Sequence, residues 1–213
     1  MAIKPILFNT EMVRAILDGR KTCTRRVIKP QPDEKHTYPL GFVTDGTEKK
    51  EVGCFGFAAN EYGGSIQYVK PPYRYAPGDF LYVRETWKKA PNGYYYYEDW
   101  QRDDIADITK WHPSIHMPKE AARIWLKVID VKVERLQEIT EESALAEGAD
   151  KYIHLNGKFD ENAILTSFMG IWNSTIKNSD LDRYGWNANP WVWIIEFERC
   201  EKPKEESEET QHE

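Results

Sequence analysis

Apolar and polar residues alternate along residues 123–136, a two-residue period that is typical of half-buried strands. This stretch changes face near Ile129, which predicts a bulge or a bend there. Residues 80–87 follow a turn at 76–79 and are rich in apolar and aromatic side chains, so they predict a further strand. Residues 191–197 are almost entirely apolar and predict a last, buried strand. Two shorter strands are predicted, at 4–9 and, as a hairpin partner of 80–87, at 94–97.

Apolar residues at helical spacing predict three helices. In residues 11–18 apolar side chains recur four positions apart; Thr10 can cap the start, and Gly19 can end the helix in the left-handed conformation. The second predicted helix is residues 140–148, which Thr140 caps and Gly148 closes. The third is residues 162–176, with its buried face formed by Ile164, Phe168, Ile171 and Trp172.

Two irregular segments interrupt this pattern, at about 30–75 and 99–118. We expect both to be insertions rather than domains, the first with at most one hairpin. Five to six strands with few helices predict a mostly β fold with helices (α+β class), built as a small, partly closed β-barrel. We expect one domain over residues 1–202. Residues 203–213 are highly charged and carry no large apolar side chain, so we expect a disordered acidic tail.

The composition, 40% hydrophobic and 30% charged residues, is typical of a soluble globular protein. No apolar run approaches the ~18 residues of a membrane span, and the N-terminus lacks the pattern of a secretory signal. We therefore expect a cytoplasmic location and no membrane partner. Cys23, Cys54 and Cys200 are widely spaced and odd in number, which predicts free thiols rather than disulfides or a zinc site.

The net charge of −6 is unevenly distributed, because residues 201–213 hold six acids and two lysines. The rest of the chain is close to neutral, and residues 14–29 contain six cations and only one acid, Asp18. Such a local excess of positive charge suits a nucleotide or a single-stranded RNA better than a long duplex. The alternative is a solvated basic face without a ligand.

Residues 19–26 read Gly-Arg-Lys-Thr-Cys-Thr-Arg-Arg and fall where a helix is expected to give way to a strand. Lys21, Thr24 and Arg26 can therefore converge at one tight junction. A carboxylate is available at Glu147, in the last turn of the second predicted helix, where it opposes the helix dipole by ~0.3–1 kcal/mol. An acid at such an unfavourable position points to function; the alternative is a structural ion pair with Lys21 or Arg26.

These residues carry a family resemblance. The pattern Gly19-x-Lys21-x-x-Thr24-x-Arg26 resembles the Gly-x-Lys-x-x-Glu-x-Arg signature of the ASCH superfamily. The resemblance implies a PUA-like β-barrel and covers most of the chain except the two insertions and the tail. Its further matches are residues 77–79, 83–87, 136–148 and 193–197.

Position 24 departs from the common signature, because Thr24 stands where most of the superfamily has Glu. In this respect the chain is similar to a small bacterial branch that acts as N4-acetylcytidine amidohydrolase. In that branch the Lys and Thr of the signature work with a Glu near the end of a helix, which Glu147 matches by order and spacing. The larger size of this chain, including residues 111–118, resembles ASCH proteins encoded by phages and prophages.

The resemblance implies a catalytic set of Lys21, Thr24 and Glu147. Hydrolysis of an amide needs a nucleophile, a proton shuttle and stabilisation of the oxyanion. Thr24 can attack directly or position a water. Lys21 can activate that hydroxyl or stabilise the oxyanion, and Glu147 can carry the proton to the leaving amine.

Two alternatives come from other functional classes. A non-catalytic RNA-binding module would use the same cleft to hold its ligand. A metal-independent ribonuclease, which some ASCH relatives resemble, would use Lys21 and Glu147. The expected partner is a modified nucleoside or a single-stranded RNA.

Further side chains are candidates for substrate binding. A carboxylate such as Glu85 can accept from a base edge, and aromatic rings can stack on a base. The structural alternatives are an ordinary strand-end ion pair for Glu85 and core packing for the aromatic rings. The predicted substrate-binding residues are Arg26, Glu85, Trp87, Trp186 and Tyr75.

No cofactor or metal is expected. His112 and His116 lie four residues apart, but Pro113 and Pro118 disfavour a regular helix there, and no acid or cysteine completes a ligand set. Phosphate-loop and dinucleotide signatures are also absent from the sequence.

Overall fold

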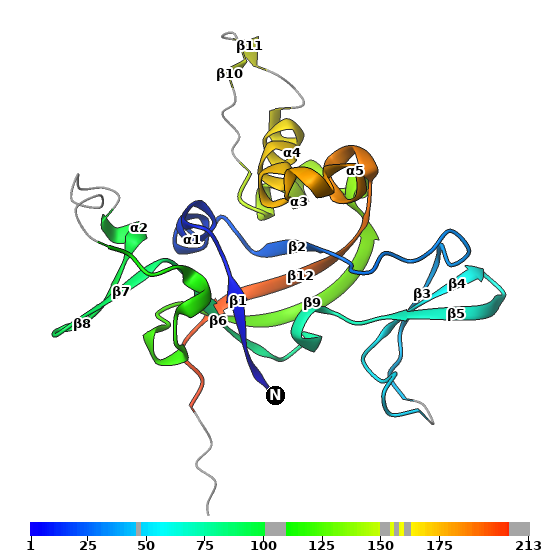
Figure 1. Cartoon of the computed structure of the whole chain (residues 1–213), viewed down its shortest axis with the longest axis horizontal. Coiled ribbons are helices and arrows are strands. Elements are labelled where there is room, and N and C mark those ends of the chain that lie inside the picture. Colours follow the sequence, from blue (N-terminus) through cyan, green and yellow to red (C-terminus); the bar gives the residue numbers. More distant parts are fainter. Residues whose placement is uncertain (46–47, 101–109, 150–153, 156–157, 160–162, 205–213) are drawn as a thin grey trace, which may run out of the picture.

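The computed structural model describes residues 1–45, 48–100, 110–149, 154–155, 158–159 and 163–204. Its largest element is a five-stranded sheet of order β1–β6–β9–β12–β2 (Figure 1). β1 and β6 run parallel, and the other neighbouring strands are antiparallel. The strands are β1 (Ile3–Leu7), β2 (Cys23–Val27), β6 (Phe80–Arg84), β9 (Trp125–Arg135) and β12 (Trp191–Cys200).

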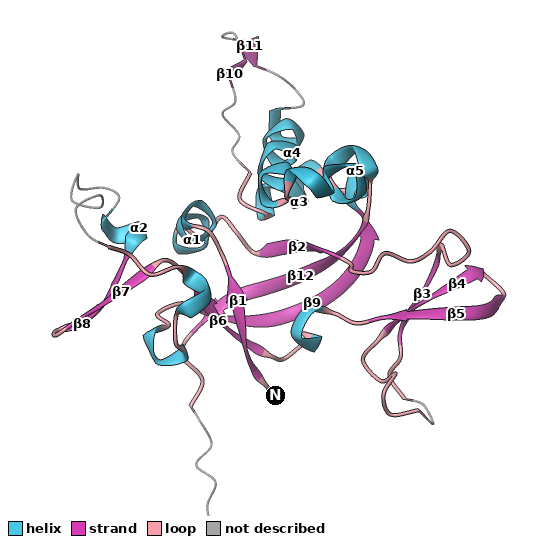
Figure 2. Ribbon diagram, in the orientation of Figure 1, coloured by secondary structure: helices cyan, strands magenta, loops and turns pink. Residues whose placement is uncertain are grey.

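Strands and helices are mixed and strands predominate, so the predicted α+β class is confirmed (Figure 2). The five-stranded sheet is open over the described residues, because its edge strands β1 and β2 do not pair with each other. The long strands β9 and β12 curve together through the centre of the molecule. β12, near the end of the described chain, pairs with β2, near its beginning, and also with β9. The sheet thus joins the N-terminal and C-terminal segments.

The two faces of the sheet bury separate apolar clusters, as the alternation along β12 requires. Trp193 and Ile195 point into the larger cluster, which also holds Val13 and Ile16 of α1 (Thr10–Leu17). Val192 points to the other side, into a cluster with side chains of the helical layer. That layer consists of α3 (Glu141–Ala146), α4 (Ala163–Thr175) and α5 (Leu181–Tyr184).

Most predicted element positions are confirmed within a few residues. α1 covers the first predicted helix, but its cap is Asn9 rather than Thr10, because the Asn9 side chain accepts from the Met12 amide. Thr140 caps α3 as expected, accepting from the Ser143 amide. The predicted bulge at Ile129 is confirmed by a register shift where β9 meets β12.

The segment predicted as an irregular insertion at 30–75 is more ordered than expected. It contains a three-stranded antiparallel sheet of β3 (Tyr38–Phe42), β4 (Phe55–Asn60) and β5 (Gly63–Val69). Phe55 and Phe57 of β4 pack against Trp193 and Trp191, with ring centroids 6.1 and 5.1 Å apart. This sheet therefore contributes side chains to the main core, which the sequence pattern did not indicate.

The predicted hairpin precedes the second insertion. β7 (Trp87–Ala90) pairs with β8 (Gly93–Tyr96), and α2 (Tyr97–Trp100) follows. The hairpin partner of residues 94–97 is therefore β7 alone, because the chain leaves the main sheet after Arg84. Residues 101–109 of this insertion lie outside the described residues, as do 205–213 of the predicted tail.

Two short strands, β10 (His154–Leu155) and β11 (Lys158–Phe159), form a further antiparallel pair before α4. Across the part of the chain that the structure describes, every helix is too short or too polar to span a bilayer.

Candidate functional site

The junction between α1 and β2 sets the position of Lys21. Gly19 adopts a φ of +73°, in the left-handed region that glycine tolerates best, and the chain turns sharply there. The backbone amides of Arg20 and Lys21 both donate to the Ala15 carbonyl, at 2.8 and 3.0 Å. The Thr22 amide then donates to the Ala146 carbonyl at 2.8 Å, so the junction is tied to the end of α3.

Lys21 and Glu147 form a buried ion pair, although 126 positions separate them in the sequence. The Lys21 ammonium donates to the Glu147 carboxylate (Nζ to Oε2, 2.6 Å) and to the Glu147 carbonyl oxygen (2.8 Å). The two residues are only 2% and 6% exposed. Glu147 is the C-cap of α3, so the ammonium offsets both its carboxylate charge and the negative end of the helix.

Gly148 allows this close approach. Its φ is +92°, and a Cβ built on it would lie 3.0 Å from Cβ of Ala15 and 3.7 Å from Cβ of Lys21. A side chain at position 148 would therefore be strained and would push α3 away from α1. The predicted end of the second helix at Gly148 is thus also the contact that brings Glu147 to Lys21.

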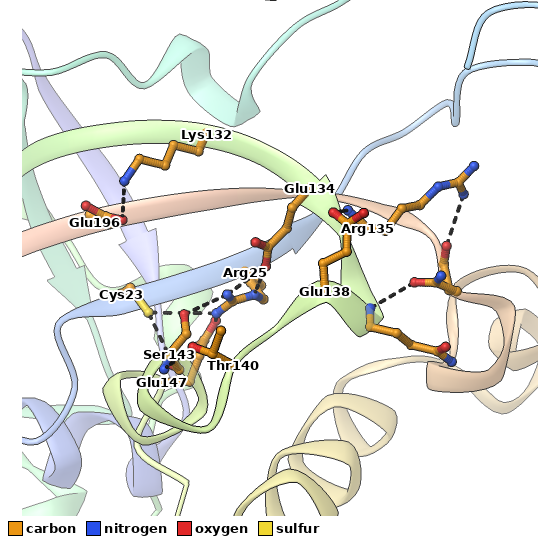
Figure 3. A network of polar contacts seen from close by, with 12 residues as sticks. Cys23, Arg25, Lys132, Glu134, Arg135, Glu138, Thr140, Ser143, Glu147 and Glu196 are labelled. Atoms are coloured by element: carbon orange, nitrogen blue, oxygen red, sulfur yellow. Dashed lines mark hydrogen bonds and ion pairs between the residues drawn. The ribbon is translucent and has the colours of Figure 1, made fainter. Parts of the chain in front are cut away.

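Arg25 is the central cation of the network in Figure 3, and sequence analysis did not select it as a site residue. Its guanidinium donates to Glu134 (Nε to Oε1, 2.7 Å) and to Ser143 (Nη2 to Oγ, 2.7 Å). Nη1 lies 3.4 Å from Oε1 of Glu147. One oxygen of Glu147 thus has a short bond to Lys21, and the other has a longer contact to Arg25.

Strand alternation is the sequence signal that points to Arg25 as a partner of the helical layer. Arg25 and Cys23 point to the helical side of β2, whereas Thr24 and Arg26 point to the opposite side. Residues of α3 can therefore contact Arg25 directly, but they cannot contact Thr24 in the same way.

Cys23 lies beside this network but is a poor nucleophile there. Burial and the nearby Glu147 carboxylate raise the pKa of the Cys23 thiol to about 12, and the cations Lys21 and Arg25 offset only part of this rise. The thiol is therefore protonated at neutral pH.

Thr24 and Arg26 lie on the inner side of the sheet, with the Phe8 ring nearby. Thr24 is 1% exposed and pairs with Ile195 of β12. The Arg26 guanidinium donates to the Leu7 carbonyl at 2.8 Å and lies 5.4 Å from the centre of the Phe8 ring. Burial lowers the pKa of Arg26, and the Glu147 carboxylate opposes this shift.

A hollow of about 340 Å³ opens next to the ion pair. This volume lies within the ~300–1,000 Å³ typical of small-ligand sites. Glu147 is one of the residues of its wall, whereas Lys21, which is bonded to the Glu147 carboxylate, is not. The lining residues come from α1, the junction, the end of α3 and α4: Asn9, Glu11, Met12, Arg14, Ala15, Arg20, Glu147, Gly148, Ser167 and Ile171.

Most of the basic residues of segment 14–29 do not form an open surface patch. Lys21 and Arg25 are buried in ion pairs, and Arg26 is bound to the backbone. Arg14 pairs with Glu98 at 2.7 Å and Arg20 with Asp18 at 3.2 Å. Four of the six cations of this segment are thus matched by carboxylates, Lys21 and Arg25 in the interior and Arg14 and Arg20 nearer the surface.

The other predicted binding residues lie apart from the Lys21–Glu147 pair. Tyr75 is buried and donates its hydroxyl to the Pro5 carbonyl, and burial raises its pKa. Trp87 is buried in a small cluster with Met117. Trp186 packs edge-on against Phe168 in the helical layer, at 6.1 Å.

Glu85 is likewise engaged elsewhere. Both of its carboxylate oxygens accept from Arg123, at 2.9 Å each. Burial raises the pKa of Glu85, and the Arg123 guanidinium opposes this shift. The structural alternative of a strand-end ion pair is thus what the structure shows, with Arg123 as the partner, while Arg84 donates to the Met117 carbonyl.

The described residues contain no group of three or more His, Cys, Asp or Glu side chains able to hold a metal ion. His112 forms a backbone bridge with Trp87, and His116 ends a single 3-10 turn, Ser114–His116. Their four-residue spacing therefore does not place them on a helix.

Comparisons with family models, curated proteins and solved structures find no match for this chain.

Proposed function

We propose that the Lys21–Glu147 pair and the hollow beside it form a metal-independent hydrolytic site for an N4-acylated cytidine-type nucleoside. The observation that carries this proposal is a fully buried ammonium bonded to a carboxylate that lines a hollow. A buried Lys–Glu pair is seldom required for stability, since apolar replacements are often as stable. Buried titratable pairs beside a cavity are typical of acid–base sites.

The resemblance to the ASCH superfamily supports the choice of substrate and reaction. That resemblance places Lys21 and Glu147, which are far apart in the sequence, in one catalytic set. Their side chains are in contact at 2.6 Å. It would also class the five-stranded sheet as PUA-like, and this classification is part of the proposal. The insertions and Thr24 then distinguish this chain from the common pattern.

The proposed reaction follows from the position of Glu147 in the wall of the hollow. Glu147 accepts a proton from a water as the water oxygen attacks the acyl carbon. The carbon–nitrogen bond then breaks, and Glu147 returns the proton to N4 of the leaving cytidine. One water is consumed, and the products are cytidine and a carboxylic acid.

The neighbouring cations define supporting roles. Lys21 places a positive charge against the Glu147 carboxylate and fixes its position through a 2.6 Å bond. Arg20 places a positive charge in the wall of the hollow, where it can stabilise the oxyanion. Thr24 is 1% exposed, so direct attack by its hydroxyl needs the substrate to enter beyond Glu147, whereas attack by water does not.

The decisive experiment is a chromatographic assay of free N4-acetylcytidine, and of further acyl groups, with the full chain. We expect release of cytidine by the wild type, survival of turnover in excess chelator, and loss of ~10²–10⁴ in rate for Glu147→Gln. Thr24→Ser and Thr24→Val separate the two nucleophiles. Turnover by Thr24→Ser but not by Thr24→Val indicates attack by the hydroxyl. Turnover by both variants indicates attack by water.

The two alternatives predict different results in the same experiments. A non-catalytic RNA-binding module shows salt-dependent RNA affinity and no turnover of any acyl nucleoside by folded wild-type protein. A metal-independent ribonuclease cleaves RNA in excess chelator and loses this activity in Lys21→Ala and Glu147→Gln. Turnover of the nucleoside that persists in Lys21→Ala would contradict the proposed site.

A further inference from the structure

The β7–β8 hairpin carries aromatic side chains on both of its faces. Trp87 lies opposite Tyr96 in the pairing, and Lys88 lies opposite Tyr95. On one face Trp87 and Tyr96 pack with Met117. Because side chains alternate along a strand, Lys88 and Tyr95 point to the other face, which this cluster leaves uncovered.

A slot of about 210 Å³ lies on that other face. Its lining consists of Lys88, Ala90, Tyr95, Trp100 and Trp111, all of which are partly exposed. The rings of Tyr95 and Trp100 lie 5.9 Å apart at an angle of 72°. The two rings do not stack face to face, so they do not fill the slot. Ring surface therefore remains available to a planar guest.

The charge in the lining of the slot selects the kind of guest. Lys88 is the one charged side chain among the described residues that line it. The two acids of α2 are engaged elsewhere, since Glu98 pairs with Arg14 and Asp99 with Arg123. A lysine inside the slot repels a cationic guest such as a methylated lysine and favours an anionic one.

We propose that this slot binds an unpaired base of a single-stranded nucleic acid. The base stacks on Tyr95 or Trp100, and Lys88 contacts a neighbouring phosphate. Aromatic rings beside lysines are the combination with which proteins hold unpaired bases without reading their sequence. This combination is absent from segment 14–29, whose cations are largely neutralised.

The slot adjoins the hollow through α2. Trp100 of α2 lines the slot, and Glu98 of α2 binds Arg14, which lines the hollow. Figure 1 shows α2 beside α1, and the two helices are in contact. A strand held in the slot would therefore pass near the hollow, but the proposal does not depend on hydrolysis there.

The test is fluorescence anisotropy of labelled eight-nucleotide oligo(C), as RNA and as DNA, titrated with the full chain. We expect Tyr95→Ala to weaken binding about tenfold, because stacking on one base is worth roughly that much. Lys88→Ala should lower the slope of log affinity against log salt by about 0.7, the value for one phosphate contact on a single strand.

Two matched variants serve as controls. Tyr62→Ala removes an aromatic ring that is 89% exposed in the β4–β5 turn, and Lys70→Ala removes an exposed lysine after β5. Both should bind the oligonucleotide as the wild type does. Equal losses in Tyr62→Ala and Tyr95→Ala would overturn the proposal.

Three other outcomes would also overturn it: no binding by the wild type, preference for a duplex over the single strand, or Tyr95-dependent binding of a proline-rich or trimethyl-lysine peptide without binding of oligo(C). Hydrolysis of N4-acetylcytidine should be unchanged in Tyr95→Ala. Failure of the slot and failure of the hydrolytic site are thereby separated.

Discussion

Two carboxylates, Glu147 and Glu85, are both buried and both paired with cations, yet their surroundings differ. Glu85 is held by both arms of the Arg123 guanidinium at 2.9 Å, and it is absent from the lining of the hollow. Glu147 has one short bond, to Lys21, and one longer contact of 3.4 Å, to Arg25, and it lines the hollow.

This difference separates a structural ion pair from a candidate site. A two-armed arginine fork uses the acceptor capacity of a carboxylate and fixes its orientation. A carboxylate with one weakly engaged oxygen beside a ligand-sized hollow keeps capacity for a substrate or a proton. Burial and charge alone do not distinguish the two, whereas the partners and the adjacent space do.

The largest expected effect comes from replacing the Glu147 pair by apolar side chains. Lys21→Met with Glu147→Leu should reduce turnover by ~10²–10⁴ because the proton acceptor is removed. The melting temperature should change little, since apolar replacement of a buried pair is often neutral and Arg25 keeps Glu134 and Ser143 as partners.

The matched control for that experiment is Glu85→Leu with Arg123→Met, which makes the same exchange in the other pair. It should retain the turnover of the wild type. Similar losses of turnover in both double variants would remove the distinction between the two carboxylates.

A single substitution in the second pair should act on stability. Glu85→Gln leaves Arg123 with a neutral partner at a buried position, and breaking such a pair costs up to about 3 kcal/mol, reduced here because Asp99 still binds the guanidinium. Urea unfolding measures the loss, and turnover per folded molecule should stay constant. An unchanged unfolding midpoint would show that Arg123 needs only Asp99.

The free energy of unfolding at alkaline pH depends on Cys23, whose thiol lies near the Glu147 carboxylate. The pKa of Cys23 is raised from an ordinary value of 9.0 to about 12 in the folded chain. The unfolded thiol therefore ionises first, so this contribution is fully present below pH 9 and is lost as the pH rises toward 12.

Between pH 9 and pH 10.5 the loss should be about 2 kcal/mol for the wild type. Urea unfolding of wild type and Cys23→Ala at both pH values measures the difference, because Tyr75 contributes equally to both proteins. Parallel losses in the two proteins would contradict a strongly raised Cys23 pKa.

The smallest expected effect is deletion of residues from Pro203 onward. This segment offers little apolar surface to bury, so the melting temperature should change by less than about one degree. A drop of several degrees would indicate that its acids bind cations of the body, with Arg20 in the wall of the hollow as a candidate. Turnover of the truncated chain would then test for autoinhibition.

Local pattern predicted the elements better than their arrangement. The period-two pattern gave the position of β9, including the bulge at Ile129, because alternation depends on which side chains a strand buries. The apolar runs within 80–87 and 191–197 gave β6 and β12. The same reasoning allowed at most one hairpin in 30–75 and did not predict the three-stranded sheet, where Pro39, Gly41 and Gly56 interrupt the alternation. Aromatic contacts to Trp191 and Trp193, which are not local, stabilise that sheet.

The sequence by itself determined the residue types of the site, the turn at Gly19 and the end of α3 at Gly148, since these follow from the spacing and conformational freedom of neighbouring residues. Only the tertiary structure decided which charges meet. Arg25 rather than Arg26 contacts Glu147, and Arg123, 38 positions away, holds Glu85. Ion pairs between distant segments depend on sheet order and strand face, which are set by burial of the whole core rather than by any local pattern.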